Sequence, residues 1–175
     1  MISLKGQKVR LRAVEPSDAK LIFEWENNEQ NWQLSQTLVP FSMHTINQYV
    51  ETAHKDIFEN KQLRLMIVDL QSEKTIGSID LFDFDAYNLK AGVGVLINDA
   101  SDRKQGFAKE SLELLINYSK DVLMLKQLYC NIGVHNLASI SLFESCDFIK
   151  TGTKKNWERI SSNQWEDIFF FQLCF

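Results

Sequence analysis

"KAGVGVLINDASDRKQGFAKESLELLINYSKDVL", residues 90–123, decides the fold of this chain. Its first part, 91–97, is an apolar run typical of a strand, and its last part, 108–123, repeats apolar residues at helical spacing. A basic turn that contains Gly106 joins the two parts. A strand that enters a helix through a tight turn leaves unpaired backbone N–H groups at the helix N-terminus, and these groups favour an anion.

The residues of this turn suit a phosphate ligand. Gly106 allows the backbone to approach a ligand closely, and Arg103 and Lys104 add positive charge. The turn RKQGFA, residues 103–108, is neither a P-loop, which ends in GK[ST], nor a G-x-G-x-x-G dinucleotide motif. We interpret it as a cradle for a pyrophosphate. An ordinary turn glycine is the alternative, and the turn taken alone favours it.

The flanking sequence adds strands and helices in a mixed order. Besides the strand at 91–97, alternating or apolar runs predict strands at 8–14, 62–70, 74–85, 127–134 and 167–175, and a strand with a turn at 147–160. Helical spacing predicts helices at 16–28, 42–57, 108–123 and 136–146. The second and third strands are expected to pair as a hairpin. The last strand is apolar on both faces, which indicates a central position. This order predicts an α+β, or mixed α/β, domain.

Length and composition limit the class of protein. The 175 residues fit a single domain, 1–175, and the formal net charge of -4 argues against general nucleic-acid binding. We expect no signal peptide and no membrane span, because no apolar run approaches the length that either needs. Cys130, Cys146 and Cys174 lack metal-ligand spacing, and the three histidines are scattered. Free thiols in a cytoplasmic protein without a metal site are therefore expected.

Two motifs resemble one known family. Arg103-x-x-Gly106-x-Ala108 matches the [Q/R]-x-x-G-x-[G/A] motif of the GNAT superfamily of acetyl-CoA-dependent N-acetyltransferases. "NLASISLFESCDF", residues 136–148, resembles that family's N-x-x-[A/S]-x-x-L-[Y/F]-x-x-x-G-F segment. The resemblance extends over essentially the whole chain, and residues 11–28 are most similar to the branch of ribosomal-protein N-terminal and spermidine N-acetyltransferases. It implies a mixed, mostly antiparallel sheet of six to seven strands flanked by about four helices.

The resemblance also implies how acetyl-CoA is bound. The strand before the turn diverges from the next strand in such enzymes, and the pantetheine arm lies in the resulting slot. The residues implied for the slot are Val95, Leu96 and Ile97, and those implied for the pyrophosphate are Arg103, Lys104, Gln105, Gly106, Phe107 and Ala108. Asn136 matches the position whose side chain contacts the pantetheine arm. It equally fits the N-cap of the following helix.

The residues implied for catalysis depart from the family pattern. The reaction is the direct attack of a neutral amine on the thioester, and a backbone N–H near Leu96 would polarise the thioester carbonyl. Gly92 stands where many members have an acidic base, and Phe143 stands where many have a tyrosine acid. Asp80 is the best substitute base, and Ser139 is a substitute acid or an ordinary first-turn helix residue.

The acceptor is not identified by any of these residues. Asp83 and Asp85 make, with Asp80, an acidic strand end that attracts a cationic amine or is simply solvated. The candidates for acceptor binding on the early helices and on the strand 127–134 all have core packing as their alternative; they are Trp25, Asn28, Trp32, Phe41, Tyr129 and Asn131. We expect an N-acetyltransferase acting on a polyamine-like molecule or a protein N-terminus. The alternatives are an inactive acetyl-CoA-binding module and an interaction domain without CoA. A homodimer through the last strand also stays open.

Overall fold

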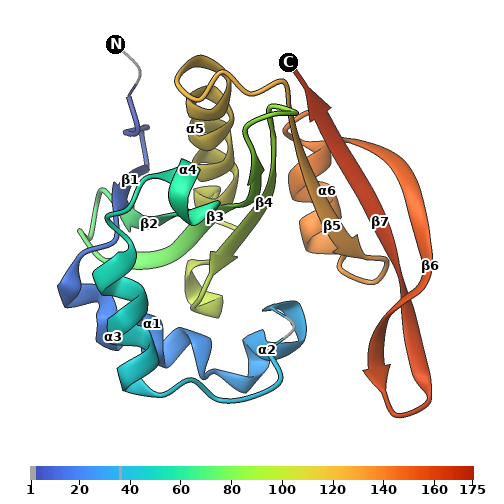
Figure 1. Ribbon diagram of the computed structural model, residues 1–175, viewed down its shortest axis with the longest axis horizontal. Helices are drawn as coiled ribbons and strands as arrows, with labels where there is room; N and C mark the ends of the chain where they lie inside the picture. The colour runs from blue at the N-terminus through green and yellow to red at the C-terminus, as the bar shows by residue number, and fades with distance from the viewer. Residues whose placement is uncertain (1–2, 36) are drawn as a thin grey trace.

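The computed structural model describes residues 3–35 and 37–175 (Figure 1). Its strands are β1 Val9–Ala13, β2 Leu63–Asp69, β3 Thr75–Asp85, β4 Lys90–Ile97, β5 Gln127–Gly133, β6 Ile149–Ser161 and β7 Gln164–Cys174. Its helices are α1 Ala19–Glu26, α2 Glu29–Ser35, α3 Met43–Thr52, α4 Ile57–Asn60, α5 Phe107–Asp121 and α6 Leu137–Glu144. Short 3-10 turns at Pro16–Asp18 and Ala100–Asp102 precede α1 and α5. The mixed α/β class is confirmed.

The four expected helices correspond to α1, α3, α5 and α6, and two short helices add to them. The expected helix 16–28 begins as a 3-10 turn at Pro16 and stops at Glu26, after which α2 begins separately at Glu29. The expected second helix divides as well. The α-helix α3 ends at Thr52, and Asp56 caps α4 by accepting hydrogen bonds from the N–H groups of Phe58 and Glu59. The cap at Asp56 thus separates α4 from α3.

Seven strands form one sheet in the order β1-β2-β3-β4-β5-β7-β6. Every neighbouring pair is antiparallel except β4 and β5, which are parallel. The predicted hairpin of β2 and β3 is confirmed. The C-terminal strand β7 lies between β5 and β6, as its two apolar faces predict, so both its edges are paired within the chain. A central position within one chain, the alternative to a dimer interface for this strand, therefore holds over residues 168–172.

The sheet is divided between β4 and β5. These strands pair only over Lys90–Gly92 with Gln127–Tyr129, and β4 then continues to Ile97 paired with β3 alone. Beyond Tyr129, β5 pairs with β7 alone. The two strands diverge in the view of Figure 1. The slot that the resemblance implies is thus present in the backbone.

Helices cover the two faces of the sheet unequally. On one face, α5 and α6 bury Leu112, Leu115 and Phe143 against alternate strand residues such as Ile79 and Val93. Burying each such side chain stabilises the fold by about 1.5–3 kcal/mol. On the other face, α1 and α3 form a smaller cluster, made of Ile22, Trp25, Ile46, Val50 and Met66. The remaining part of this second face is available for a site.

Candidate active site

The turn between β4 and α5 is shaped by its backbone. Gly106 is the N-cap of α5 with φ 86°, a left-handed conformation that favours glycine, and no side chain caps the helix. Lys104 also has a positive φ, of 62°. Because the helix begins without a side-chain cap, its first N–H groups are available to an anion. The predicted anion cradle is therefore compatible with the structure, and the residues present fit the pyrophosphate of a coenzyme A thioester.

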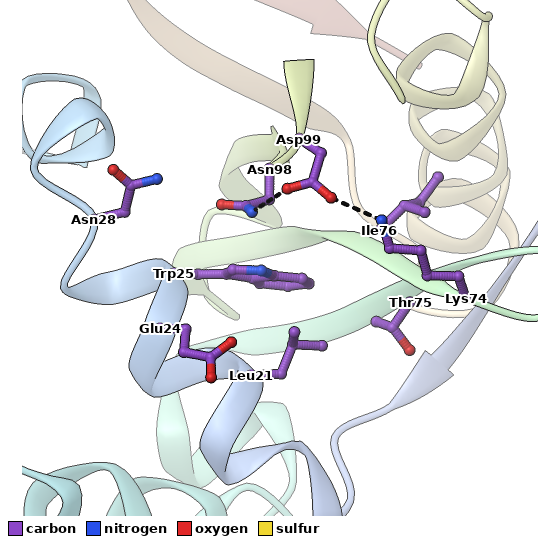
Figure 2. A pocket seen from close by; sticks show the side chains of 9 residues that line it. All are labelled: Leu21, Glu24, Trp25, Asn28, Lys74, Thr75, Ile76, Asn98 and Asp99. Carbon is purple, nitrogen blue, oxygen red and sulfur yellow. Dashed lines mark hydrogen bonds and ion pairs between the residues drawn. The ribbon is translucent and has the colours of Figure 1, made fainter. Parts of the chain in front are cut away.

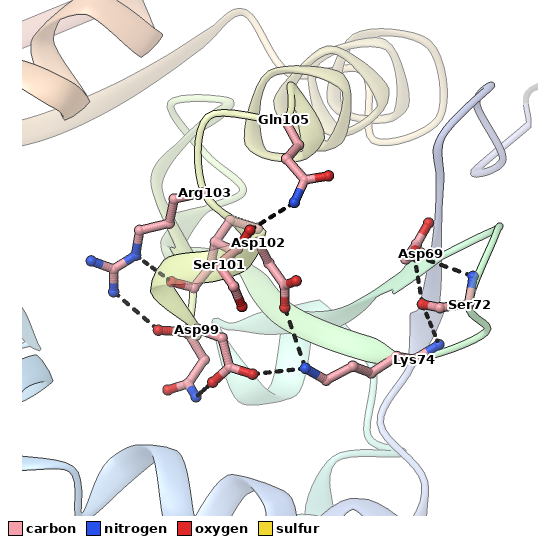
Figure 3. Close-up of polar contacts among 10 residues, drawn as sticks. Asp69, Ser72, Lys74, Asp99, Ser101, Asp102, Arg103 and Gln105 are labelled. Carbon is pink, nitrogen blue, oxygen red and sulfur yellow. Dashed lines mark hydrogen bonds and ion pairs between the residues drawn. The ribbon is translucent and has the colours of Figure 1, made fainter.

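Side chains of the turn hold its own backbone (Figure 3). The Arg103 guanidinium donates to the carbonyl oxygens of Ile97 (3.1 Å) and Asn98 (3.0 Å), and Gln105 donates to the carbonyl of Ser101 (2.7 Å). The sequence motif predicts Arg103 as a phosphate-attracting charge, whereas its hydrogen bonds tie the turn to the end of β4. These hydrogen bonds position the loop.

An ion-pair cluster links the turn to the start of β3. Lys74, immediately before β3, binds Asp99 (2.7 Å), the N-cap of the 3-10 turn, and Asp102 (3.4 Å), the last residue of that turn. The hydrogen bond to Asp99 raises the pKa of Lys74, burial opposes this rise, and the hydrogen bond to Asp102 adds to it. The aspartates thus anchor the loop to the sheet.

The slot residues divide between the two faces of β4. Ile97 is buried in the α5 core and Val95 packs against it, whereas Leu96 belongs to the alternate set, on the opposite face. Side chains of Val95 and Ile97 thus hold the strand in place. Its backbone is the part that faces the slot, as the resemblance implies for pantetheine.

Asn136 and Ser139 lie together at the start of α6. The Oδ1 of Asn136 accepts a hydrogen bond from the backbone N–H of Ser139 at 3.1 Å, so the N-cap role is confirmed. This contact uses the oxygen and leaves the side-chain NH₂ to donate to a ligand. The helix α6 packs on the α5 face, because Phe143, which is buried, belongs to that core and stacks edge-on against Phe148 at 5.0 Å.

An aromatic group occupies the place where many family members have a base. A Cβ on Gly92 would lie 2.3 Å from Cε2 of Phe82, so the Phe82 ring fills the space beside the glycine. Tyr129, opposite Gly92 in the last β4–β5 pair, stacks on Phe82 (6.1 Å) and on Phe170 (5.5 Å). We call Phe82, Tyr129 and Phe170 the aromatic group. The sequence shows a glycine at position 92, but its position opposite Phe82 follows only from the register of β3 with β4.

Tyr129 also makes a polar contact with a predicted acceptor residue. Its hydroxyl donates to Oδ2 of Asp83 at 3.2 Å. Burial and the nearby Asp83 carboxylate raise the pKa of Tyr129 to about 12, so it stays a neutral phenol at physiological pH. Asn131, on the same strand face, accepts from Lys154 of β6 at 2.8 Å. The structure therefore brings Asp83, Tyr129 and Asn131 to one region of the sheet.

The candidate base Asp80 is part of an ionic network. Arg64 donates from Nε to Oδ1 of Asp80 (2.6 Å), from Nη2 to its Oδ2 (3.3 Å), and from Nη1 to Glu26 (2.7 Å). Arg64 also lies over the Tyr49 ring, 5.5 Å from its centroid. Burial alone would lower the pKa of Arg64, but the Asp80 carboxylate, Tyr49 and Glu26 raise it overall. We call Glu26, Arg64 and Asp80 the ionic triad; isolated charges in the sequence gave no signal that Glu26 and Arg64 meet Asp80.

Two of the early-helix candidates, Trp25 and Asn28, lie at a pocket of about 430 Å³ between α1 and the ends of β3 and β4 (Figure 2). Its lining residues are Leu21, Glu24, Trp25, Asn28, Lys74, Thr75, Ile76, Asn98 and Asp99. Trp25 is buried and also belongs to the α1–α3 cluster, so its core alternative holds. Trp32 does not line the pocket and donates from its indole N–H to the carbonyl of Glu26 at 2.8 Å. The structure thus separates Trp25 and Asn28 from Trp32.

Two further findings concern the described residues, 3–35 and 37–175. No group of histidine, cysteine and acidic side chains there is arranged to hold a metal ion. No helix there is long and apolar enough to cross a membrane.

The divided sheet and the helix start without a side-chain cap are compatible with an extended, phosphate-bearing ligand. Residues 8–149 match the family model described as an acetyltransferase (GNAT) domain, and the chain belongs to this family. It is therefore an N-acetyltransferase, for which acetyl-CoA is the co-substrate and an amine is the acceptor. The expected family, activity and co-substrate are confirmed.

Curated relatives and a solved structure share the whole domain. The chain is 26% identical to a spermidine N(1)-acetyltransferase of Vibrio cholerae, over 84% of this chain and 82% of the relative. It is 24% identical to an uncharacterized N-acetyltransferase, p20, of Bacillus licheniformis, over 99% and 96%. The structure of spermidine N-acetyltransferase from Vibrio cholerae in complex with CoA and spermine superposes with a TM-score of 0.85 at 22% identity, over 97% of this chain and 96% of that one.

Proposed function

We propose that the acceptor is a small, cationic, polyamine-type molecule that presents a primary amine. One observation carries the proposal: the face of the sheet next to the slot has more carboxylates than cations to balance them. In the ionic triad, two carboxylates share the single guanidinium of Arg64, and Asp83 is hydrogen-bonded to a neutral phenol. The second cation of this region is Lys154, which lies over the Phe170 ring and donates to Asn131, so the carboxylates still outnumber the cations. A polycation is attracted to such a surface. The similarity to spermidine N-acetyltransferases favours the same class of acceptor.

The chemistry requires a neutral amine. An alkyl amine with a pKa of about 10.4 is neutral in only about one molecule in 2,500 at pH 7, so a proton must leave before attack. The amine nitrogen then bonds to the carbonyl carbon, the carbon–sulfur bond breaks, and the thiolate takes up a proton. The backbone N–H near Leu96 polarises the carbonyl, and holding both reactants in the slot lowers the barrier.

We propose Asp80 as the base and Ser139 as the acid. Asp80 belongs to the ionic triad and lies close to Phe82 of the aromatic group along β3. Because both its oxygens accept from Arg64, Asp80 takes a proton only as one of these bonds loosens. Ser139 has its backbone N–H tied to Asn136, which fixes the start of α6 while its hydroxyl stays half-buried.

Two alternatives each have an observation in their favour. An inactive acetyl-CoA-binding module is favoured because Phe82 fills the space beside Gly92 and Phe143 has no proton to give. A protein N-terminus is favoured because Arg64 occupies both oxygens of the proposed base Asp80, and an α-amino group with a pKa of about 7.7–8.0 is already neutral far more often at pH 7.

The test is thiol release with an amine panel. The purified protein, with acetyl-CoA, is offered spermidine, spermine, a monoamine of the same length, and peptides with free N-termini. We expect turnover with the polyamines, slower turnover with the monoamine, and a KM for polyamines that rises with salt. Turnover with peptides alone would reject the polyamine proposal. Binding of CoA without turnover on any amine would establish the inactive module.

The proposal extends to the molecule as a whole. We propose a single domain spanning 1–175 that works in the cytoplasm as a homo-oligomer, without nucleic acid as a partner. The net charge of -4 supports the last point. A solved structure titled as dodecameric spermidine N-acetyltransferase from Vibrio cholerae, with a TM-score of 0.76, supports an oligomer.

A further inference from the structure

The segment before β1 is fastened to the first turn of α5. The carboxylate of Glu110 accepts hydrogen bonds from the backbone N–H groups of Gln7 (2.9 Å), Lys8 (2.8 Å) and Val9 (2.7 Å). A Cβ on Gly6 would lie 2.5 Å from Cδ of Glu110, so the glycine allows the close approach of this segment. Residues 6–9 are therefore held against the helix that begins at the phosphate loop.

This fastening places the side chain of Lys8 at the phosphate loop. Its Nζ donates to the carbonyl oxygen of Gln105 at 2.8 Å, and it lies 3.1 Å from where a Cβ on Gly106 would be. The described chain has no cis peptide bonds. In a trans peptide the N–H and the C=O point in opposite directions. With Lys8 on the carbonyl, the N–H of Gly106 is turned to the other side of the loop.

The orientation of this peptide matters because its neighbours have unusual backbone angles. Lys104 and Gly106 both have positive φ, at 62° and 86°. A glycine reaches either sign of φ readily, so the Gln105–Gly106 peptide is free to rotate unless something holds it. The side chains of Arg103 and Gln105 bind other carbonyls of the turn, those of Ile97, Asn98 and Ser101. A rotated peptide would point its carbonyl oxygen at the bound phosphate and repel it.

We propose that Lys8 is a positioning residue of the phosphate loop. Its ammonium holds the carbonyl of Gln105 and polarises the peptide, so that the N–H of Gly106 donates to the pyrophosphate of acetyl-CoA. Lys8 also adds a positive charge behind the loop, which is the role that the sequence motif predicts for Arg103. This inference rests on the loop being the pyrophosphate site of the acetyltransferase.

The test compares Lys8→Ala and Lys8→Arg with wild type. Lys5→Ala is the matched control, since it removes the same charge from the same segment and no hydrogen bond joins the Lys5 side chain to the loop in the described part of the chain. Calorimetry measures the Kd of free CoA, and steady-state kinetics compare acetyl-CoA with acetyl-pantetheine, which lacks the pyrophosphate.

We expect Lys8→Ala to raise the Kd for CoA about tenfold, equivalent to about 1.4 kcal/mol. The kcat at saturating acetyl-CoA and the KM for acetyl-pantetheine should stay within about twofold of wild type. Lys8→Arg should recover most of the affinity, because a guanidinium also donates to a carbonyl. Lys5→Ala should bind CoA as wild type does.

Three outcomes would overturn the proposal. A Kd for CoA within twofold of wild type in Lys8→Ala would show that the Gln105–Gly106 peptide keeps its orientation without Lys8. An equal loss with acetyl-pantetheine would point to a distorted slot, and an equal loss in Lys5→Ala to general charge. If wild-type protein binds no CoA at millimolar concentration, the assignment of the loop fails instead, and this result is distinct from the other three.

Discussion

Gly106 is the residue at which backbone geometry and ligand binding meet. Its φ of 86° disfavours any side chain, and a Cβ there would crowd Nζ of Lys8 at 3.1 Å. We expect Gly106→Ala to cost about 1–2 kcal/mol of folding stability and to weaken CoA binding more than tenfold, because the strained turn moves its N–H groups. Urea unfolding and CoA calorimetry measure the two effects. Wild-type affinity in this variant would show that the loop is an ordinary turn.

Asp80 carries the proposed base function and one side of the ionic triad. We expect Asp80→Asn to lower kcat more than tenfold at pH 7 while the Kd for CoA stays within twofold, because Asp80 lies on the acceptor side of the sheet. Folding stability should also fall, since Arg64 keeps only Glu26 as a charged partner.

Asp85→Asn is the control for the Asp80 variant, because Asp85 is on the same strand end and binds the local backbone of the turn at Tyr87 and Asn88. It should leave kcat near wild type. If Asp80→Asn turns over normally, Asp80 is structural and the base is another group.

The chemical type of the residues near the site was predicted well from the sequence, and the direction in which each side chain points was predicted less well. The sequence indicates which side chains are basic or acidic near the site, but not which backbone or charge each one meets. Arg103 faces the end of β4 because the turn folds back on that strand, and Asp80 faces Arg64 because β2 and β3 pair as a hairpin. Phe82 was missed since its role depends on the register with Gly92.

At the scale of elements, Glu110 joins α5 to the segment before β1. Burial would raise the pKa of Glu110, but the N–H groups of Gln7, Lys8 and Val9 outweigh it and hold the pKa below its ordinary value of 4.5. A carboxylate with a depressed folded pKa stabilises the fold above its unfolded pKa. This stabilisation is lost as the pH falls through the folded pKa.

We therefore expect the stability of wild type to exceed that of Glu110→Gln at neutral pH, and the gap to close progressively below about pH 4.5. Urea midpoints between pH 7 and pH 3 measure it. Glu113→Gln, an exposed position on the same helix, should keep the wild-type profile. Parallel profiles for wild type and Glu110→Gln would remove the proposed link between α5 and residues 7–9.

Elements with a strong pattern were predicted from sequence, and short ones were not. The strands around the divided sheet and the long helix α5 follow apolar periodicity, which local sequence carries. The helices α2 and α4 are 7 and 4 residues long, too short for periodicity to reveal, and their positions depend on local capping and on packing. The N-cap of α6 was predictable because Asn136 immediately precedes it.

At the scale of the whole molecule, the β6–β7 hairpin exposes large apolar side chains. Ile149, Trp157, Ile160 and Trp165 are all exposed on it. The outer strand β6 has three irregularities in its register and several lysines, features that oppose strand-to-strand association. We expect the proposed oligomer to bury the side chains of the hairpin, with the strand edge left unpaired.

Sedimentation velocity tests this expectation. Wild type should sediment as an oligomer at micromolar concentration, and Trp157→Glu with Trp165→Glu should shift it to a monomer. Tyr87→Glu, at a more exposed aromatic position outside the hairpin, is the control and should leave the oligomer intact. A wild-type monomer across the whole concentration range would contradict the proposed oligomer.

The order of strands in the sheet was only partly predictable. Neighbours that follow each other in sequence, such as β2 and β3, are fixed by a short turn. The insertion of β7 between β5 and β6 has one sequence signal, a strand apolar on both faces, and that signal does not name its neighbours. Long-range pairing is set by the packing of the complete chain.

The short contact between β4 and β5 has a consequence for local stability. Three residue pairs join β4 to β5 in the sheet, and we expect residues 93–97 of β4, which pair with β3 and not with β5, to open locally while the rest of the sheet stays paired. Amide hydrogens of residues 93–97 on the slot side should exchange with deuterium quickly in the free protein and slowly with CoA, while β2 stays protected in both. Equal exchange with and without CoA would contradict this. If CoA slows the exchange as expected, the bound coenzyme acts as an additional strand of the sheet, and its release is equivalent to local unfolding.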